Sequence, residues 1–104
     1  MAEADKIALY RSGIGKYGRQ EFEGARADFE QALRLDPDFG DAHHSLAHAL
    51  EKLGDLDGAL AAARRAVELS PEEVLAHTTL SVIYMRQGMV PEAEAAKATA
   101  AQLQ

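Results

Sequence analysis

A period of 34 residues runs through the chain and restricts its fold more than any other feature of the sequence. Alanine recurs twice in triples at this spacing and leucine once: Ala25, Ala59 and Ala93; Ala32, Ala66 and Ala100; Leu35, Leu69 and Leu103. Pairs keep the same spacing, among them Pro37 with Pro71, His43 with His77, Leu46 with Leu80 and Gly54 with Gly88. A fixed period of this length indicates supersecondary units that bury their apolar faces by stacking on one another.

The period divides the chain into unit one (residues 6–39), unit two (40–73) and unit three (74–104), which we expect to form a single domain over 1–104. Each unit holds two segments with apolar residues at helical spacing, separated by a polar or glycine-containing break. We therefore expect six helices, at 4–18, 22–35, 40–53, 56–69, 72–87 and 91–103.

Helix-end signals accompany these segments. Gly54 and Gly88 suit the left-handed residue that ends many helices, and Pro91 suits the first turn of the last helix. Ser70-Pro71-Glu72-Glu73 has the form of a capping box, which predicts a helix start there.

Small residues lie where the two helices of each unit are expected to cross. They are Gly13, Ala47 and Ser81 in the first helices and Ala25, Ala59 and Ala93 in the second. Small side chains let two helix backbones approach closely. Larger residues such as Phe29, Leu46, Leu80 and Ile83 then fill the layers between helices. The pattern predicts an all-α array of antiparallel helix pairs.

The chain resembles the tetratricopeptide repeat (TPR) family in its period, its alanine triples, and the Leu-Asp-Pro and Leu-Ser-Pro sequences that end units one and two. The resemblance covers nearly everything after Asp5. It implies a right-handed superhelix of three helix-turn-helix units, with a concave face lined mainly by the first helix of each unit. The chain departs from the family pattern at two places. Where the family often has a large aromatic residue near the start of each unit, this chain has Leu9, His43 and His77. The family's usual aromatic residue in the second helix is kept at Phe29 but is replaced by Ala63 and Lys97 in the later units.

One stripe of each first helix is left free of helix pairing, at positions i, i+3, i+7 and i+10. The stripes are Ile7, Tyr10, Ile14 and Tyr17; Asp41, His44, His48 and Glu51; Leu75, Thr78, Val82 and Met85. Exposed apolar patches tend to be interaction sites. We predict a partner groove formed by Tyr10, Ile14, Tyr17, Asp41, His44, His48, Glu51, Thr78, Val82 and Met85. Ile7 and Leu75 belong either to the groove or to packing within the array.

The family includes modules that grip the C-terminal carboxylate of chaperone tails with Lys, Arg and Asn on this face. Those positions correspond here to Tyr10, Ile14, Ser45, Leu75 and Thr79, and none of them is basic or Asn. The sequence therefore favours an apolar or helical segment of a partner as the ligand.

His44 and His48 stand four residues apart, a spacing that lets two imidazoles reach one metal ion. No third ligand is fixed by the sequence, so we predict no metal site. A metal- or pH-responsive binder centred on this pair is the weakest alternative, since imidazole titrates near 6.5. His43 and His77 lie where residues pack between helices, so we expect them to be structural.

Several function classes are disfavoured. Eleven basic against 17 acidic residues give a net charge of −6, which argues against nucleic acid as a partner. No window approaches 18 uninterrupted apolar residues, so no membrane span is expected. The chain has no Cys, no Gly-rich phosphate loop, no G-x-S-x-G elbow and no HExxH, so we expect neither an enzyme nor a cofactor. Its acidic start is unlike a signal peptide, which favours the cytoplasm.

Together these features predict a non-enzymatic adaptor that binds a peptide or helix of another protein in its concave groove. The alternative is a self-assembling scaffold. The chain ends at 91–104 without a further polar capping helix, and repeat arrays need their open ends covered or made soluble.

Overall fold

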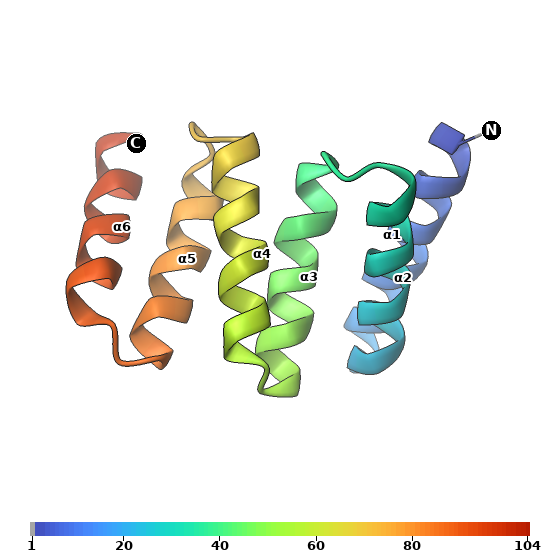
Figure 1. Cartoon of the computed structure of the whole chain (residues 1–104), viewed down its shortest axis with the longest axis horizontal. Helices are drawn as coiled ribbons and strands as arrows, with labels where there is room; N and C mark the ends of the chain where they lie inside the picture. Colours follow the sequence, from blue (N-terminus) through green and yellow to red (C-terminus); the bar gives the residue numbers. More distant parts are fainter. Residues whose placement is uncertain (1) are drawn as a thin grey trace.

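The computed structural model describes residues 2–104, with side chains from Asp5 onward. This range contains six helices and no strand: α1 (Ala2–Gly18), α2 (Phe22–Leu35), α3 (Gly40–Leu53), α4 (Leu56–Leu69), α5 (Val74–Arg86) and α6 (Val90–Gln102). The helices form three hairpins that stack in chain order into a body of 41 × 26 × 19 Å (Figure 1). The predicted all-α helical repeat is confirmed. No helix within the described range has the length and apolar character needed to cross a bilayer.

The helix bounds agree closely with the sequence prediction. The helices expected at 22–35, 40–53 and 56–69 have those bounds in the structure. Gly54 ends α3 with a φ of 84°, and Gly88 follows α5 with a φ of 77°. Both are the left-handed conformations that glycine adopts without steric cost. Pro91 lies in the first turn of α6, as predicted.

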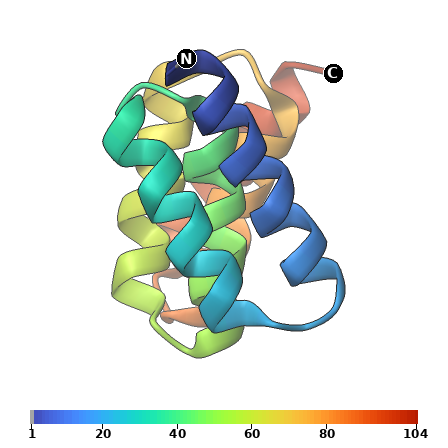
Figure 2. The same ribbon diagram turned by 90° about the vertical axis from the view of Figure 1, so that its right-hand side faces the viewer.

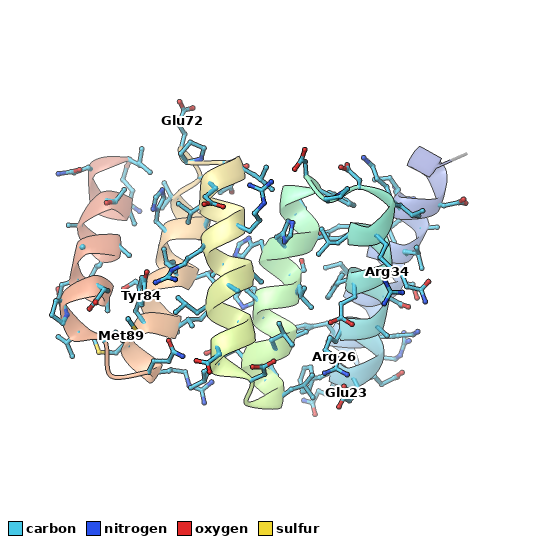
Figure 3. The ribbon with its side chains drawn as sticks, viewed as in Figure 1. Glu23, Arg26, Arg34, Glu72, Tyr84 and Met89 are labelled. Carbon is cyan, nitrogen blue, oxygen red and sulfur yellow. The ribbon has the colours of Figure 1, made fainter. Side chains whose placement is uncertain are left out.

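The predicted capping box at Ser70 is wrong. Ser70 ends α4, Glu73 precedes the first residue of α5, and the Glu73 N–H donates to the Ser70 carbonyl at 3.1 Å. The four residues therefore form a turn with proline at its second position, where the fixed φ of proline is favoured. Figure 3 shows Glu72 projecting from this turn, away from the helices. Asp36 and Phe39 close the equivalent turn one period earlier, also at 3.1 Å.

The small residues at the helix crossings are buried as predicted in units one and two. Ala25, Ala47 and Ala59 have no exposed surface. Unit one is the tightest case: a Cβ added to Gly13 would lie 2.5 Å from Cε1 of Phe29, whose side chain is fully buried. Glycine at position 13 is thus what allows α1 to lie against an aromatic ring of α2.

His43 and His77 have the structural role expected of them. The Nε2 atom of each ring lies 2.7 Å from a backbone carbonyl oxygen, that of Pro37 for His43 and that of Pro71 for His77. A carbonyl oxygen only accepts, so each Nε2 carries the proton and donates it. Each imidazole therefore ties the start of a unit to the turn that precedes it.

Candidate functional site

The first helices of the three units form the inner side of a curved array. Helix α1 touches α3 and α3 touches α5, whereas α2, α4 and α6 make no mutual contact within the described chain. In a curved stack the inner elements lie closer together than the outer ones. Figure 2 shows the stack from the α1–α2 end, with the two helices of that hairpin side by side. The first helices therefore line the concave side, and we call their common surface the first-helix face.

Helix α1 contributes apolar and aromatic side chains to the first-helix face. Ile14 is 44% exposed. Tyr17 is half-buried, and its ring centroid lies 5.2 Å from that of Phe22 and 6.4 Å from that of His48. Burial raises the pKa of the Tyr17 hydroxyl, and the nearby Glu51 carboxylate raises it further. Tyr17 thus joins the first and second units on the concave side.

Tyr10 is placed differently from what its stripe position suggests. Its ring centroid lies 5.9 Å from that of Phe29 and 5.1 Å from that of Phe39, and the side chain packs against the core. Tyr10 is half-buried and helps hold unit one together. Ile7, the other residue of this stripe, is half-buried as well.

The centre of the first-helix face is a hydrogen-bonded group of His44, His48 and Thr79. The Thr79 hydroxyl lies 2.9 Å from His44 Nε2 and 3.4 Å from His48 Nε2, and the two imidazole centroids are 5.0 Å apart. A hydroxyl has one donor proton and two acceptor lone pairs, so Thr79 can donate to one imidazole and accept from the other. The imidazole that accepts at Nε2 is then neutral.

The electrostatics of the two histidines agree with this arrangement. Burial lowers the pKa of both imidazoles. For His44 the carboxylates of Glu73 and Asp41 act in the opposite direction. For His48 the charge of His44 lowers the pKa further, Glu51 raises it and Lys52 lowers it. Both shifts favour the neutral imidazole, the form that can accept the Thr79 proton at Nε2.

Asp41 and Glu51, the two acidic residues of the α3 stripe, lie in different surroundings. Asp41 is exposed at the start of α3. Near the end of α3, the Glu51 carboxylate accepts a hydrogen bond from Arg86 Nη1 at 3.2 Å, which links α3 to α5. The sequence prediction missed Arg86. The signal available was spacing: opposite charges one period plus one residue apart lie on neighbouring first helices.

Helix α5 supplies the second apolar part of the first-helix face. Val82 and Met85 are each 47% exposed and Leu75 is 61% exposed. Thr78 is exposed, and its hydroxyl donates to the Val74 carbonyl within the same helix. The first-helix face thus has polar side chains on α3 between exposed apolar side chains on α1 and α5, with Tyr10 largely withdrawn from it.

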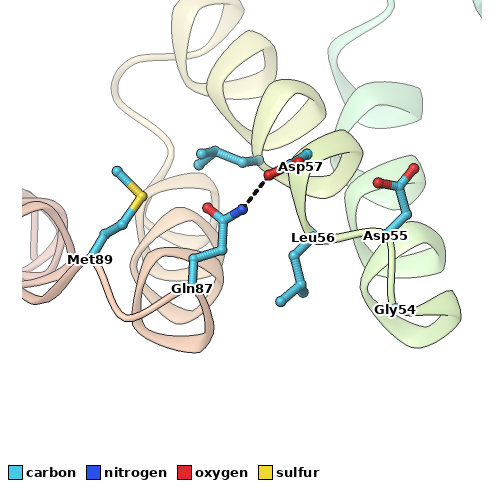
Figure 4. A pocket seen from close by; sticks show the side chains of 7 residues that line it. Gly54, Asp55, Leu56, Asp57, Gln87 and Met89 are labelled. Carbon is cyan, nitrogen blue, oxygen red and sulfur yellow. Dashed lines mark hydrogen bonds between the residues drawn. The ribbon is translucent and has the colours of Figure 1, made fainter.

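A small cavity of about 130 Å³ opens between α1 and α3. Its lining residues are Ile14, Tyr17, Phe29, Ser45 and His48. A larger hollow of about 560 Å³ lies at the turns that follow α3 and α5, where Gln87 Nε2 donates to Asp57 at 2.7 Å (Figure 4). That hollow is wide open, and it is separate from the predicted groove residues.

No metal centre is visible among the side chains of residues 5–104. No three His, Cys, Asp or Glu residues in that range are grouped so as to hold an ion. The Nε2 atoms of His44 and His48 instead share the Thr79 hydroxyl.

Comparison with solved structures shows the same fold in several proteins. The Arabidopsis OM64 TPR domain has a TM-score of 0.95 at 16% identity, covering 100% of this chain and 86% of that one. The first TPR of Spaghetti (RPAP3), bound to the HSP90 peptide SRMEEVD, has a TM-score of 0.93 at 16% identity, covering 97% and 80%. MamA has a TM-score of 0.91 at 21% identity, covering 95% and 58%, so this chain spans little more than half of MamA.

Comparison by sequence gives fewer matches than comparison by structure. No curated protein matches the chain. A family model described as Tetratricopeptide repeat matches twice, over residues 10–74 and 44–103. Because these two matches together span nearly the whole sequence, the chain belongs to the tetratricopeptide repeat family.

Proposed function

We propose that this chain is a non-enzymatic cytoplasmic adaptor whose first-helix face binds a peptide or helix of another protein. The observation that carries the proposal is the exposure of Ile14, Val82 and Met85, between 44% and 47%, on first helices that share the concave side. Exposed apolar side chains on both sides of one concave face favour that face as an interaction surface. Both TPRs of Spaghetti (RPAP3) are bound to an HSP90 peptide, so the fold accommodates such ligands.

The chemistry of this face favours an apolar segment over an acidic tail. The positions that grip a chaperone carboxylate in the family are Tyr10, Ile14, Ser45, Leu75 and Thr79, and none can supply a positive charge. The Thr79 hydroxyl is already shared by two imidazoles. Asp41 and Glu73, whose charges act on His44, are acidic and would repel a carboxylate-rich ligand.

A matched pair of valines tests the proposal. Val82 and Val90 are both 47% exposed, but Val82 lies on the first-helix face and Val90 begins the second helix α6. The wild-type chain, Val82→Glu and Val90→Glu are used as baits in a lysate of the source cells, and captured proteins are identified by mass spectrometry. We expect a partner that Val82→Glu loses and Val90→Glu keeps, with both variants as helical as the wild type. Equal capture by all three baits would refute the proposal. Fractionation of source cells tests the cytoplasmic location.

Self-assembly through the C-terminal end, the alternative from the sequence, is opposed by the composition of α6. Helix α4 packs against both α3 and α5, and its Leu60 and Ala63 are buried. One period later, Glu94 and Lys97 are exposed on α6. A second copy stacked there would have to bury two charged side chains, which costs free energy. We therefore expect light scattering to give a constant mass of 11.2 kDa at rising concentration. A mass that rises with concentration would restore the alternative.

A further inference from the structure

We infer that the cavity between α1 and α3 is a pocket for one aliphatic or aromatic side chain of a partner segment with basic flanking residues. This inference rests on the proposed function, because it names the ligand chemistry of the same face. It commits to one feature that the groove as a whole does not specify: a single apolar anchor at the junction of units one and two.

The walls of the pocket are mostly carbon. The buried Phe29 contributes from α2, and Ile14 and Tyr17 line the α1 side. Helix α3 supplies Ser45 and His48. The Nε2 atom of His48 is directed to Thr79, and its ring meets Tyr17 edge-on. The Nε2 atom of the imidazole is thereby engaged outside the pocket.

The size of the pocket matches one side chain. Its volume of about 130 Å³ is close to that of an engineered apolar cavity of roughly 150 Å³ that stays dry and binds benzene. A leucine, isoleucine, methionine or phenylalanine side chain is of this order. A charged side chain placed there would lose its hydration with no ion partner in the lining, which excludes Lys, Arg, Asp and Glu.

The equivalent positions at the junction of units two and three carry polar side chains that contact one another. The apolar pocket is therefore a feature of the junction of units one and two. Ile14, Tyr17 and Ser45 correspond to His48, Glu51 and Thr79. At the second junction His48 contacts the Thr79 hydroxyl, and Glu51 pairs with Arg86. The apolar anchor site therefore belongs to units one and two, and a bound segment has a fixed register along the face.

The charge around the pocket sets the flanking residues of the ligand. His48 lines the pocket, its ring centroid lies 5.0 Å from that of His44, and the carboxylates of Glu73 and Asp41 act on His44. On the α1 side, Lys16 is already paired with Asp28 at 3.1 Å. Asp41 is exposed on the first-helix face and Glu73 is exposed just before α5. Basic residues beside the apolar anchor would be attracted to these carboxylates, and acidic ones would be repelled.

The test uses short peptides and nuclear magnetic resonance of the full ¹⁵N-labelled chain. The probe is acetyl-Lys-Ala-Leu-Ala-Lys-amide, compared with the same peptide carrying Ala in place of Leu and with one carrying Glu in place of both Lys residues. We expect saturable shifts at the amides of Ile14, Tyr17 and Ser45 with the first peptide. The Ala peptide should bind at least about tenfold more weakly, since it lacks the buried side chain. The Glu peptide should also bind more weakly. Equal binding of the Leu and Ala peptides would overturn the inference.

Variants of the chain locate the binding event. Ser45→Leu fills the pocket and should abolish the shifts caused by the Leu peptide. Ser70→Leu makes the same change at an exposed position at the end of α4 and should leave them intact. Ser45→Leu also changes the packing between α1 and α3. Ile14→Gln is therefore a second variant, which makes one exposed wall of the pocket polar with a residue that favours helix. Retained binding in both pocket variants would overturn the inference.

The outcomes separate this inference from the proposed function. If Ser45→Leu still captures the lysate partner that Val82→Glu loses, the face binds a partner and the pocket inference is wrong. If the peptides shift only the amide signals of Val82 and Met85, the pocket inference is wrong as well. If no partner depends on Val82 but the Leu peptide still saturates Ile14 and Ser45, the pocket stands and the adaptor proposal fails.

Discussion

Units one and three use the same helix pair but hold it together differently. In unit one, Phe29 of α2 is fully buried and α1 has glycine, Gly13, where it meets the ring. In unit three, the position of Phe29 is occupied by the exposed Lys97. The position of Gly13 is occupied by Ser81, whose hydroxyl donates to the Ala93 carbonyl at 2.8 Å. At these matched positions, an aromatic contact in unit one is replaced by a hydrogen bond between side chain and backbone in unit three.

This difference follows from the place of each unit in the array. The ring of Phe29 lies against Gly13 of α1, and α2 also packs on α3. Within residues 2–104, helix α6 packs on α5 alone, and the equivalent residue is exposed. An aromatic ring there would expose apolar surface, whereas the charged end of lysine stays in water. We therefore expect stability to be distributed unequally, with unit one contributing more than unit three.

The largest expected effect is that of removing the ring from unit one. Phe29→Ala should lower the free energy of unfolding by about 3–5 kcal/mol, because it deletes a fully buried aromatic side chain and leaves a cavity. Lys97→Ala, the same position in unit three, should change it by less than about 0.5 kcal/mol. Urea unfolding followed by circular dichroism measures both. If Phe29→Ala leaves too little native protein to measure, Phe29→Leu provides a smaller step in the same direction. Equal effects at positions 29 and 97 would remove the difference between the units.

The contact between Gly13 and Phe29 predicts that the effect of Gly13→Ala on the free energy of unfolding changes sign when Phe29 is replaced. Gly13→Ala should destabilise the wild type by about 1–2 kcal/mol, because the new Cβ meets the ring at 2.5 Å. In the Phe29→Leu background the clash is relieved, and the same substitution should stabilise through the better helix propensity of alanine, by up to about 1 kcal/mol. A double-mutant cycle in urea measures the coupling. Additive effects would show that the ring does not require the glycine.

The repeat and the fold could be predicted from the sequence because the constraint is periodic. Positions such as Ala25, Ala59 and Ala93 recur at one spacing, and each is essentially buried at a crossing of helices. Helix ends marked by a single residue with a fixed backbone preference, such as Gly54, were also predictable. The turn at Ser70 was misread because Ser-Pro-Glu-Glu satisfies both a helix start and a turn, and only tertiary contacts decide between them.

The candidate site was only partly predictable, because it depends on contacts between units. Helical spacing placed Ile14, Val82 and Met85 on the exposed concave side. It could not show that Tyr10 packs between Phe29 and Phe39, since that depends on where the turn after α2 runs. The sharing of Thr79 by His44 and His48 depends on the offset of α3 against α5, and no single-helix pattern contains that offset.

Acid should weaken the polar junction between units two and three before it affects unit one. The pKa of His44 and that of His48 are both lowered in the folded chain by burial, from an ordinary value of 6.5. Below that pH the unfolded chain binds more protons than the folded chain, so the free energy of unfolding falls as the pH falls. The loss continues until the folded rings also protonate. Amide hydrogen exchange between pH 7 and pH 5 should show α5 losing protection before α1 and α2.

A double substitution is the control for the histidines. His44→Gln with His48→Gln should flatten the dependence of stability on pH in this range. An unchanged slope would assign the effect to other groups. Loss of protection beginning in α1 would contradict the assignment to the junction of units two and three.

The smallest expected effect is at the hydrogen bond that replaces the aromatic ring in unit three. Ser81→Ala removes the donor to the Ala93 carbonyl and should cost about 0.5–1.5 kcal/mol for the lost hydrogen bond, reduced by the better helix propensity of alanine. Thr99→Ala is the matched control, because the Thr99 hydroxyl also donates to a backbone carbonyl, that of Ala95, but within its own helix. That change should be neutral or slightly stabilising. If Ser81→Ala is no more costly than Thr99→Ala in urea unfolding, the bond between α5 and α6 does not stabilise unit three, and packing of the small residues alone holds that pair together.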